Sequence, residues 1–176
     1  MSIQYAFTCL DSIAIWAIVA TMGLTAILAG SQGYGLTRLS LPFLAGTMFT
    51  GNRHRAAQLG FFIYLIGGFL FAFVYFLVLA ELGRSNWWIG GSIGILHALF
   101  LLVAVLPVLP HVHPRMASEY DPPSSQRRLE PPGFFGLNYG YRTPLTAIVG
   151  HAVYGAVLGF GLAGPLQTLW QSAQYP

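Results

Sequence analysis

Four stretches of the chain are free of charged residues and long enough to cross a lipid bilayer. They cover residues 12–30, 56–80, 87–110 and 143–164. An α-helix rises about 1.5 Å per residue, so roughly 20 apolar residues span a hydrocarbon core of about 30 Å. In lipid every backbone polar group needs a partner within its own segment, which a helix provides. We therefore predict an all-α integral membrane protein, a four-helix bundle that forms a single domain over residues 1–176.

The composition agrees with this class. Charged residues make up 7% of the chain, whereas soluble globular domains carry about 25%. The formal net charge of +3 comes from eight arginines, which are scattered between apolar runs and form no basic stripe. We therefore predict no nucleic-acid partner. Cys9 is the only cysteine, which excludes an internal disulfide and a cysteine-based metal site.

A shorter apolar segment follows the first span. Residues 39–49 are too few to cross a bilayer, and apolar residues recur along them at helical spacing. Ser40 and Pro42 are typical of an N-cap and a first helical turn. We predict a short interfacial or re-entrant helix here, with the Ser40 side chain as its cap.

One long hydrophilic loop, residues 111–142, separates the third and fourth spans. Pro107 and Pro110 are expected to kink or end the third span before the loop. Proline pairs favour stiff, extended backbone, so we expect the loop to pack back on the helices. His111 and His113 stand near its start without a third metal ligand beside them. We interpret this histidine pair as solvated or facing lipid headgroups.

The arginines also predict an orientation. With four spans, Arg84 falls on one side of the membrane and the other seven arginines fall on the opposite side. Loops rich in Lys and Arg lie in the cytoplasm, so we expect the long loops inside and both termini outside. The same arginines could bind anionic headgroups, which makes lipids predicted partners.

Three polar rings lie inside the predicted spans: Tyr64, His97 and His151. Counted along their helices, all three come near the middle of the bilayer. Histidines at this depth could hydrogen-bond to each other and to carbonyls, and so tie helices together. Alternatively, His97 and His151 could bind a haem, a chlorophyll-type pigment or a quinone, with Tyr64 beside it. A proton or solute path is the third interpretation.

Glycines recur at the spacing of close helix packing. Without a side chain they let two backbones approach, and four-residue spacing places them on one helix face. We predict such contacts at Gly68, Gly90, Gly94, Gly155 and Gly159.

Several longer segments carry a resemblance to a known family. They include LPFLAGTMF, WWIGGSIGILHALF, LPHVHPRMASE, LEPPGFFGLNYGYRTPL and HAVYGAVLG, and they lie between residues 36 and 164. With these motifs, of which HPRMAS and EPPGF are the most specific, the chain resembles a family of uncharacterised small bacterial four-span membrane proteins. The resemblance implies a four-span bundle in a bacterial inner membrane, cytoplasmic or intracytoplasmic. It implies no activity.

No motif of a known catalytic mechanism is present in the sequence, so we expect no enzyme. The small hydrophilic part, the glycine-faced helices and the aromatic surfaces favour a non-enzymatic accessory or structural subunit. Such a subunit would dock onto a larger membrane complex, for example a photosynthetic or respiratory one. The alternatives are a cofactor-binding protein that uses His97 and His151, and a small transporter or channel.

Overall fold

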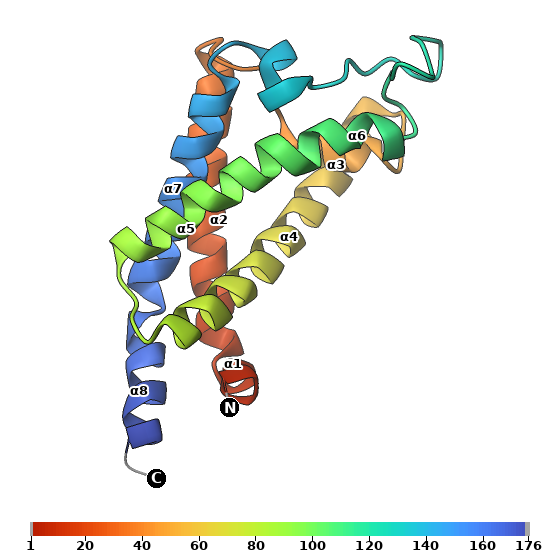
Figure 1. Ribbon diagram of the computed structural model, residues 1–176. Coiled ribbons are helices and arrows are strands. Elements are labelled where there is room, and N and C mark those ends of the chain that lie inside the picture. The colour runs from red at the N-terminus through yellow and green to blue at the C-terminus, as the bar shows by residue number, and fades with distance from the viewer. Residues whose placement is uncertain (1, 175–176) are drawn as a thin grey trace. The chain divides into compact units, whose positions relative to one another are not determined.

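The structure is a computed structural model that describes residues 2–174, and it is built from helices (Figure 1). Four helical segments are long and apolar enough to cross a membrane, which makes the chain a multi-pass membrane protein. They are α2 (Leu10–Gly33), α4 (Arg53–Leu82), the continuous segment Trp87–Val112, and α7 (Thr143–Gly161). The shorter elements are α1 (Ser2–Thr8), α3 (Leu41–Thr47), the 3₁₀ helix η2 (Phe134–Tyr139) and α8 (Ala163–Gln174). The predicted all-α class and the four spans are confirmed.

The described residues divide into two compact units. Unit 1 holds the residues up to Ala26, Leu65–Leu96, and the residues from Val149 onward. Unit 2 holds Ile27–Tyr64 and His97–Ile148. Each of the four spans contributes residues to both units, so the division does not follow consecutive segments of the chain. The prediction of a single domain stays a prediction.

The short helix predicted after the first span is α3, in unit 2. Pro42 lies in its first turn, as the sequence suggests. The predicted cap is wrong in one respect, because the Ser40 side chain makes no capping hydrogen bond. The helix packs closely on α4: a Cβ on Gly46 would overlap the carbonyl oxygen of Ala56 and lie 2.8 Å from the nitrogen of Gly60. Close backbone packing therefore holds one side of α3.

The third span changes its helical type before its prolines. It begins as α5 (Trp87–Phe100), passes through one π-helical stretch, η1 (Leu101–Val105), and continues as α6 (Leu106–Val112). Pro107 has no N–H to donate, and its ring crowds the carbonyl four residues earlier. A π-bulge relieves this conflict, because it widens the turn that precedes the proline. Pro107 and Pro110 therefore distort the span without ending it.

The long loop packs into the hydrophobic core of unit 2. Met116 is fully buried there, together with Leu39, Leu44, Leu102, Leu106, Tyr139 and Ala147. Two backbone hydrogen bonds of 3.0 Å join the loop to itself, from Ala117 to Leu129 and from Leu129 to Arg115. The expectation that the loop packs back on helices is confirmed within this unit.

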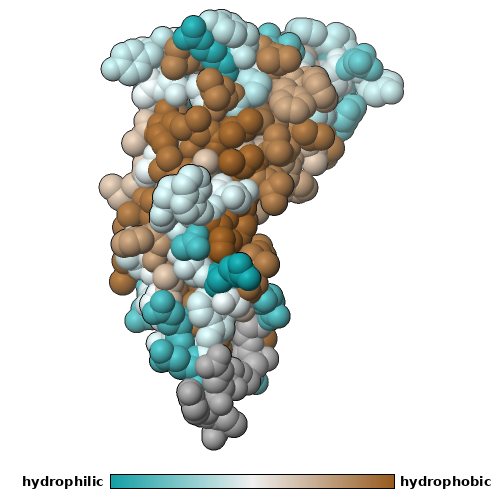
Figure 2. Space-filling view, turned by 60° about the vertical axis from the view of Figure 1, so that its left-hand side comes forward, coloured by the Kyte–Doolittle hydropathy of each residue, from teal (hydrophilic) through white to brown (hydrophobic). Residues whose placement is uncertain are grey.

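Unit 1 exposes large apolar side chains along its helices. On α4 these exposed side chains recur every four residues, at Ile66, Leu70, Val74, Val78 and Leu82. Figure 2 shows hydrophobic residues, in brown, gathered in a patch on one part of the face drawn there, with hydrophilic residues on either side of it. An apolar outer face of this kind is what a membrane-spanning helix presents to lipid or to another spanning helix.

Candidate functional site

The three polar rings singled out in the sequence do not fall in one unit. Tyr64 and His97 belong to unit 2 and are half-buried, whereas His151 belongs to unit 1 and is buried on α7. The cofactor site of His97, His151 and Tyr64 therefore stays a prediction. Among the described residues, no group of three or more His, Cys, Asp or Glu side chains could hold a metal ion.

In unit 1, α5 and α7 cross with their backbones in contact. A Cβ on Gly90 would overlap the carbonyl oxygen of Gly155 and lie 2.8 Å from the Cα of Gly159. One turn further along, a Cβ on Gly94 would overlap the carbonyl oxygen of His151. Four of the five predicted packing glycines thus meet at this crossing, since Gly155 and Gly159 face Gly90 in return. Any side chain at these positions would force the helices apart.

The fifth glycine, Gly68, lies at a different contact in unit 1. The Tyr154 hydroxyl donates a hydrogen bond of 2.5 Å to its carbonyl oxygen. The ring of Tyr154 also packs edge-on against Tyr75, with 5.5 Å between the ring centroids. On its other side, Gly68 packs against Thr21 of α2, because a Cβ there would overlap the threonine hydroxyl. Gly68 therefore joins α4 to both α7 and α2.

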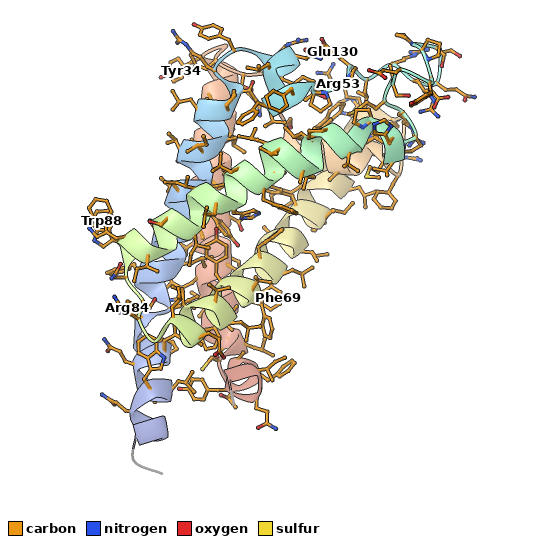
Figure 3. The ribbon with its side chains drawn as sticks, viewed as in Figure 1. Tyr34, Arg53, Phe69, Arg84, Trp88 and Glu130 are labelled. Carbon is orange, nitrogen blue, oxygen red and sulfur yellow. The ribbon has the colours of Figure 1, made fainter. Side chains whose placement is uncertain are left out.

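An apolar hollow of about 240 Å³ opens between α2 and α4 in unit 1. Two alanines of α2 line it together with larger side chains from both helices, among them Phe69, which Figure 3 labels. The complete lining is Ala14, Ala17, Ile18, Leu65, Ile66 and Phe69. Elsewhere on α4, Gly67 faces open space, with no atom within 4 Å of an added Cβ. We call the hollow the α2–α4 face.

Unit 2 contains a polar anchor that the sequence interpretation missed. His113 is 1% exposed, so its interpretation as a solvated residue is wrong. Its Nδ1 accepts a hydrogen bond of 3.1 Å from the Arg115 backbone, which leaves the proton on Nε2. Nε2 lies 3.2 Å from both the Leu44 carbonyl oxygen and the Thr47 hydroxyl. The ring therefore binds the last turn of α3.

Burial lowers the pKa of His113, and the positive charge of Arg115 lowers it further. The hydrogen bond to the Leu44 carbonyl acts in the opposite direction but does not outweigh burial. The lowered pKa means that folding favours the neutral ring over the protonated one.

Arg115 binds the same end of α3. Its Nη1 donates to the carbonyl oxygens of Thr47 and Met48, at 2.8 and 3.0 Å. The last carbonyls of a helix lack partners within the helix, and they attract positive charge. A helix of seven residues is marginal by itself, so these bonds from the loop stabilise it. This gives the HPRMAS motif a structural role: its histidine and arginine together cap α3.

Arg115 also lines a polar cavity of unit 2, which has a volume of about 960 Å³. We call it the arginine cavity, since Arg53 and Arg128 line it too. The other lining residues are Phe43, Thr47, Gly51, Pro114, Ser125, Gln126 and Leu129. No acidic residue is among them, so three positive charges face one space without compensation from its walls.

A neighbouring cavity of about 310 Å³ shares Phe43, Arg128 and Leu129 with the arginine cavity but has a different charge balance. There Arg38 forms an ion pair of 3.0 Å with Glu130, and it also donates to the carbonyl oxygen of Asn138. Figure 3 labels Glu130 and Arg53, one residue from each cavity. The smaller cavity thus contains a carboxylate that neutralises one of its arginines, whereas the arginine cavity contains none.

Comparison with known proteins gives no match, either to a protein family, to a curated protein or to a solved structure. The resemblance to small bacterial four-span proteins therefore stays a prediction, and the function is inferred from the geometry of the two units.

Proposed function

We propose that this protein is a small non-enzymatic accessory subunit that docks laterally, within the bilayer, onto a larger membrane complex. The α2–α4 face supports the proposal most directly. It combines an apolar hollow with two small residues on α2, Ala14 and Ala17. In lipid, helices associate where small residues allow close approach, because the hydrophobic effect no longer drives them together.

The burial of the spans leaves α4 open to a neighbouring helix. In the most apolar window of α7, 44% of the residues are buried, compared with 22% in those of α4 and of the third span. Burial alone thus leaves two spans available, and the hollow, which α4 lines, favours α4. A spanning helix of a photosynthetic or respiratory complex is the occupant that we propose for its face.

The alternative functions have weaker support. The arginine cavity, its smaller neighbour and the apolar hollow are lined by neither His97 nor His151. None of these three spaces therefore offers room for a macrocycle or quinone beside the two rings. The apolar hollow also lacks the polar lining that a path for a solute needs.

Photo-crosslinking in host membranes tests the docking proposal. A photoreactive residue at Ile66, which lines the hollow, should give a discrete protein adduct, identified by mass spectrometry. The same residue at Leu96, an equally exposed position on α5, serves as the control. Adducts with lipid alone at Ile66, or identical protein adducts at both positions, would contradict docking at this face.

A substitution series gives the second test. Ala14→Trp would fill the hollow, and it should reduce the amount of partner that co-purifies in mild detergent. Val19→Trp places the same side chain on α2 at an exposed position outside the hollow, and it should leave the partner bound. Equal losses from both variants would show that the hollow has no special role.

A further inference from the structure

We propose that the arginine cavity binds an anion that bears a phosphate group, at the membrane surface. Three parts of unit 2 form the walls of the cavity: α3, the segment at the start of α4, and the long loop. Its size of about 960 Å³ is in the range of known small-molecule sites.

Charge is the first argument. Unit 2 contains seven of the eight arginines but only three acidic residues. Two of those acids are already used, in the pairs Arg38–Glu130 and Arg127–Asp121, of 3.0 and 3.1 Å. Among the described residues, Arg53, Arg115 and Arg128 have no carboxylate within 4.0 Å. Positive charge gathered in one cavity attracts an anion from solution or from a membrane surface.

The donors in the cavity suit a phosphate. Arg115 is held by the two bonds from its Nη1 to α3, so its remaining N–H groups are positioned by the fold. Arg128 is steadied by a bond of 2.8 Å from its Nε to the Ser125 carbonyl oxygen. Arginine N–H groups form paired, charge-assisted hydrogen bonds with phosphate oxygens, and these are stronger than neutral ones.

The location favours a lipid headgroup as the source of the phosphate. Arg53 is the first residue of the span α4, so it marks the depth at which headgroups lie. Phe43 adds an apolar wall beside the three charges, where the start of an acyl chain could pack. Free phosphate has the same recognition chemistry but would make no use of this wall.

Binding measurements on the full-length purified protein test the proposal and separate the two sources. One arm uses nanodiscs of phosphatidylglycerol compared with phosphatidylcholine, with retained lipid counted by native mass spectrometry and stability followed by thermal unfolding. The other arm adds inorganic phosphate to protein in neutral detergent. We expect one retained phosphatidylglycerol per protein and a raised unfolding temperature in the first arm.

Two arginines of the same helical turn form a matched pair. Arg53→Gln and Arg55→Gln remove equal charge from exposed positions, but only Arg53 lines the cavity. A general attraction of the surface to anionic lipid is worth about fivefold in affinity per arginine, wherever the arginine lies. A charged hydrogen bond within a site is worth about tenfold or more. We expect at least tenfold weaker binding for Arg53→Gln and Arg128→Gln, and fivefold or less for Arg55→Gln.

A variant that keeps every arginine gives a second readout. An added Cβ on Gly51 would lie 3.4 Å from Nε of Arg115, an ordinary contact. Gly51→Asp should therefore fold, place its carboxylate beside Arg115 and abolish anion binding, whereas the uncharged Gly51→Asn should retain most of it. This test does not disturb the bonds from Arg115 to α3.

Each outcome has a defined meaning. Binding of phosphatidylglycerol with the expected sensitivity to Arg53 supports a lipid site, and the same sensitivity with inorganic phosphate alone supports a free-phosphate site. Equal losses from Arg53→Gln and Arg55→Gln would overturn the proposal in favour of general surface attraction. Failure of both anions to bind the wild-type protein would also overturn it.

Discussion

Unit 1 and unit 2 are each stabilised internally, but by opposite kinds of contact. Unit 1 contains a single arginine and two acidic residues. Its α5 and α7 cross closely because the residues at the crossing are glycines, which have no side chain. Unit 2 contains seven arginines, and its short helix α3 depends on side chains that reach it from a distant loop. We therefore expect the two units to respond to different substitutions. Added side-chain atoms at the crossing should destabilise unit 1, and removal of polar side chains should destabilise unit 2.

The largest effect is expected from an added side chain in unit 1. Gly90→Val would place its Cβ in overlap with the carbonyl oxygen of Gly155 and add two more carbons at the crossing, so the helices must separate. Overpacking of this kind costs about 3 kcal/mol of unfolding free energy. Gly67→Val, on the open surface of α4, is the control and should cost far less. Unfolding in mixed detergent micelles measures both variants, and similar losses would mean that the crossing is not tight.

A removed polar ring should have the next largest effect, in unit 2. His113→Ala leaves the Leu44 carbonyl and the Thr47 hydroxyl without the ring that contacts them. Loss of a buried partner costs about 2 kcal/mol. Hydrogen exchange should then accelerate in α3, while His111→Ala, at an exposed position, should leave it unchanged. Unchanged exchange of α3 in His113→Ala would show that the ring does not anchor it.

The same ring predicts a pH dependence. Because burial lowers the pKa of His113 in the folded state, the unfolded state binds more protons below the ordinary histidine pKa of about 6.5. Stability is therefore expected to be fully present above pH 6.5 and to fall as the pH decreases towards the folded-state pKa. The slope is at most about 1.4 kcal/mol per pH unit. Unfolding of wild type and His113→Gln between pH 7.5 and 5 measures it, and parallel curves would assign the dependence to other groups.

The smallest effect is expected at the exposed ion pair of Arg38 and Glu130. Their side chains are 66% and 48% exposed, so water and salt screen the attraction. Glu130→Gln should change the unfolding free energy by less than about 1 kcal/mol, and added salt should remove the difference. The Tyr139 hydroxyl donates a hydrogen bond of 2.7 Å to the backbone oxygen of residue 130, so that bond should survive the substitution. A larger loss that persists at high salt would require a structural role for the carboxylate.

The spans could be predicted from the sequence because hydrophobicity acts locally: residues 56–80 identify α4 without knowledge of any other segment. The glycine spacing also led to the residues of the α5–α7 crossing, since four-residue spacing defines a helix face. In contrast, the sequence around His113 contains no signal that its ring contacts Thr47 at the end of α3, which lies 66 residues earlier in the chain. The arginine cavity could not be predicted for the same reason, because its three arginines come from separate segments of the chain. Ser40 stands at the N-cap position of α3, but the sequence does not reveal that its side chain makes no capping hydrogen bond.

Isolation of the tagged protein from its own host in mild detergent is the most direct test of the accessory role. We predict that a stoichiometric larger membrane complex co-purifies with the protein, in a sample whose absorption spectrum shows no pigment bound to this chain. Recovery of the protein only as a free monomer would contradict the accessory role. A coloured monomer that loses its absorption band in His97→Ala and His151→Ala would replace that role with the binding of a cofactor.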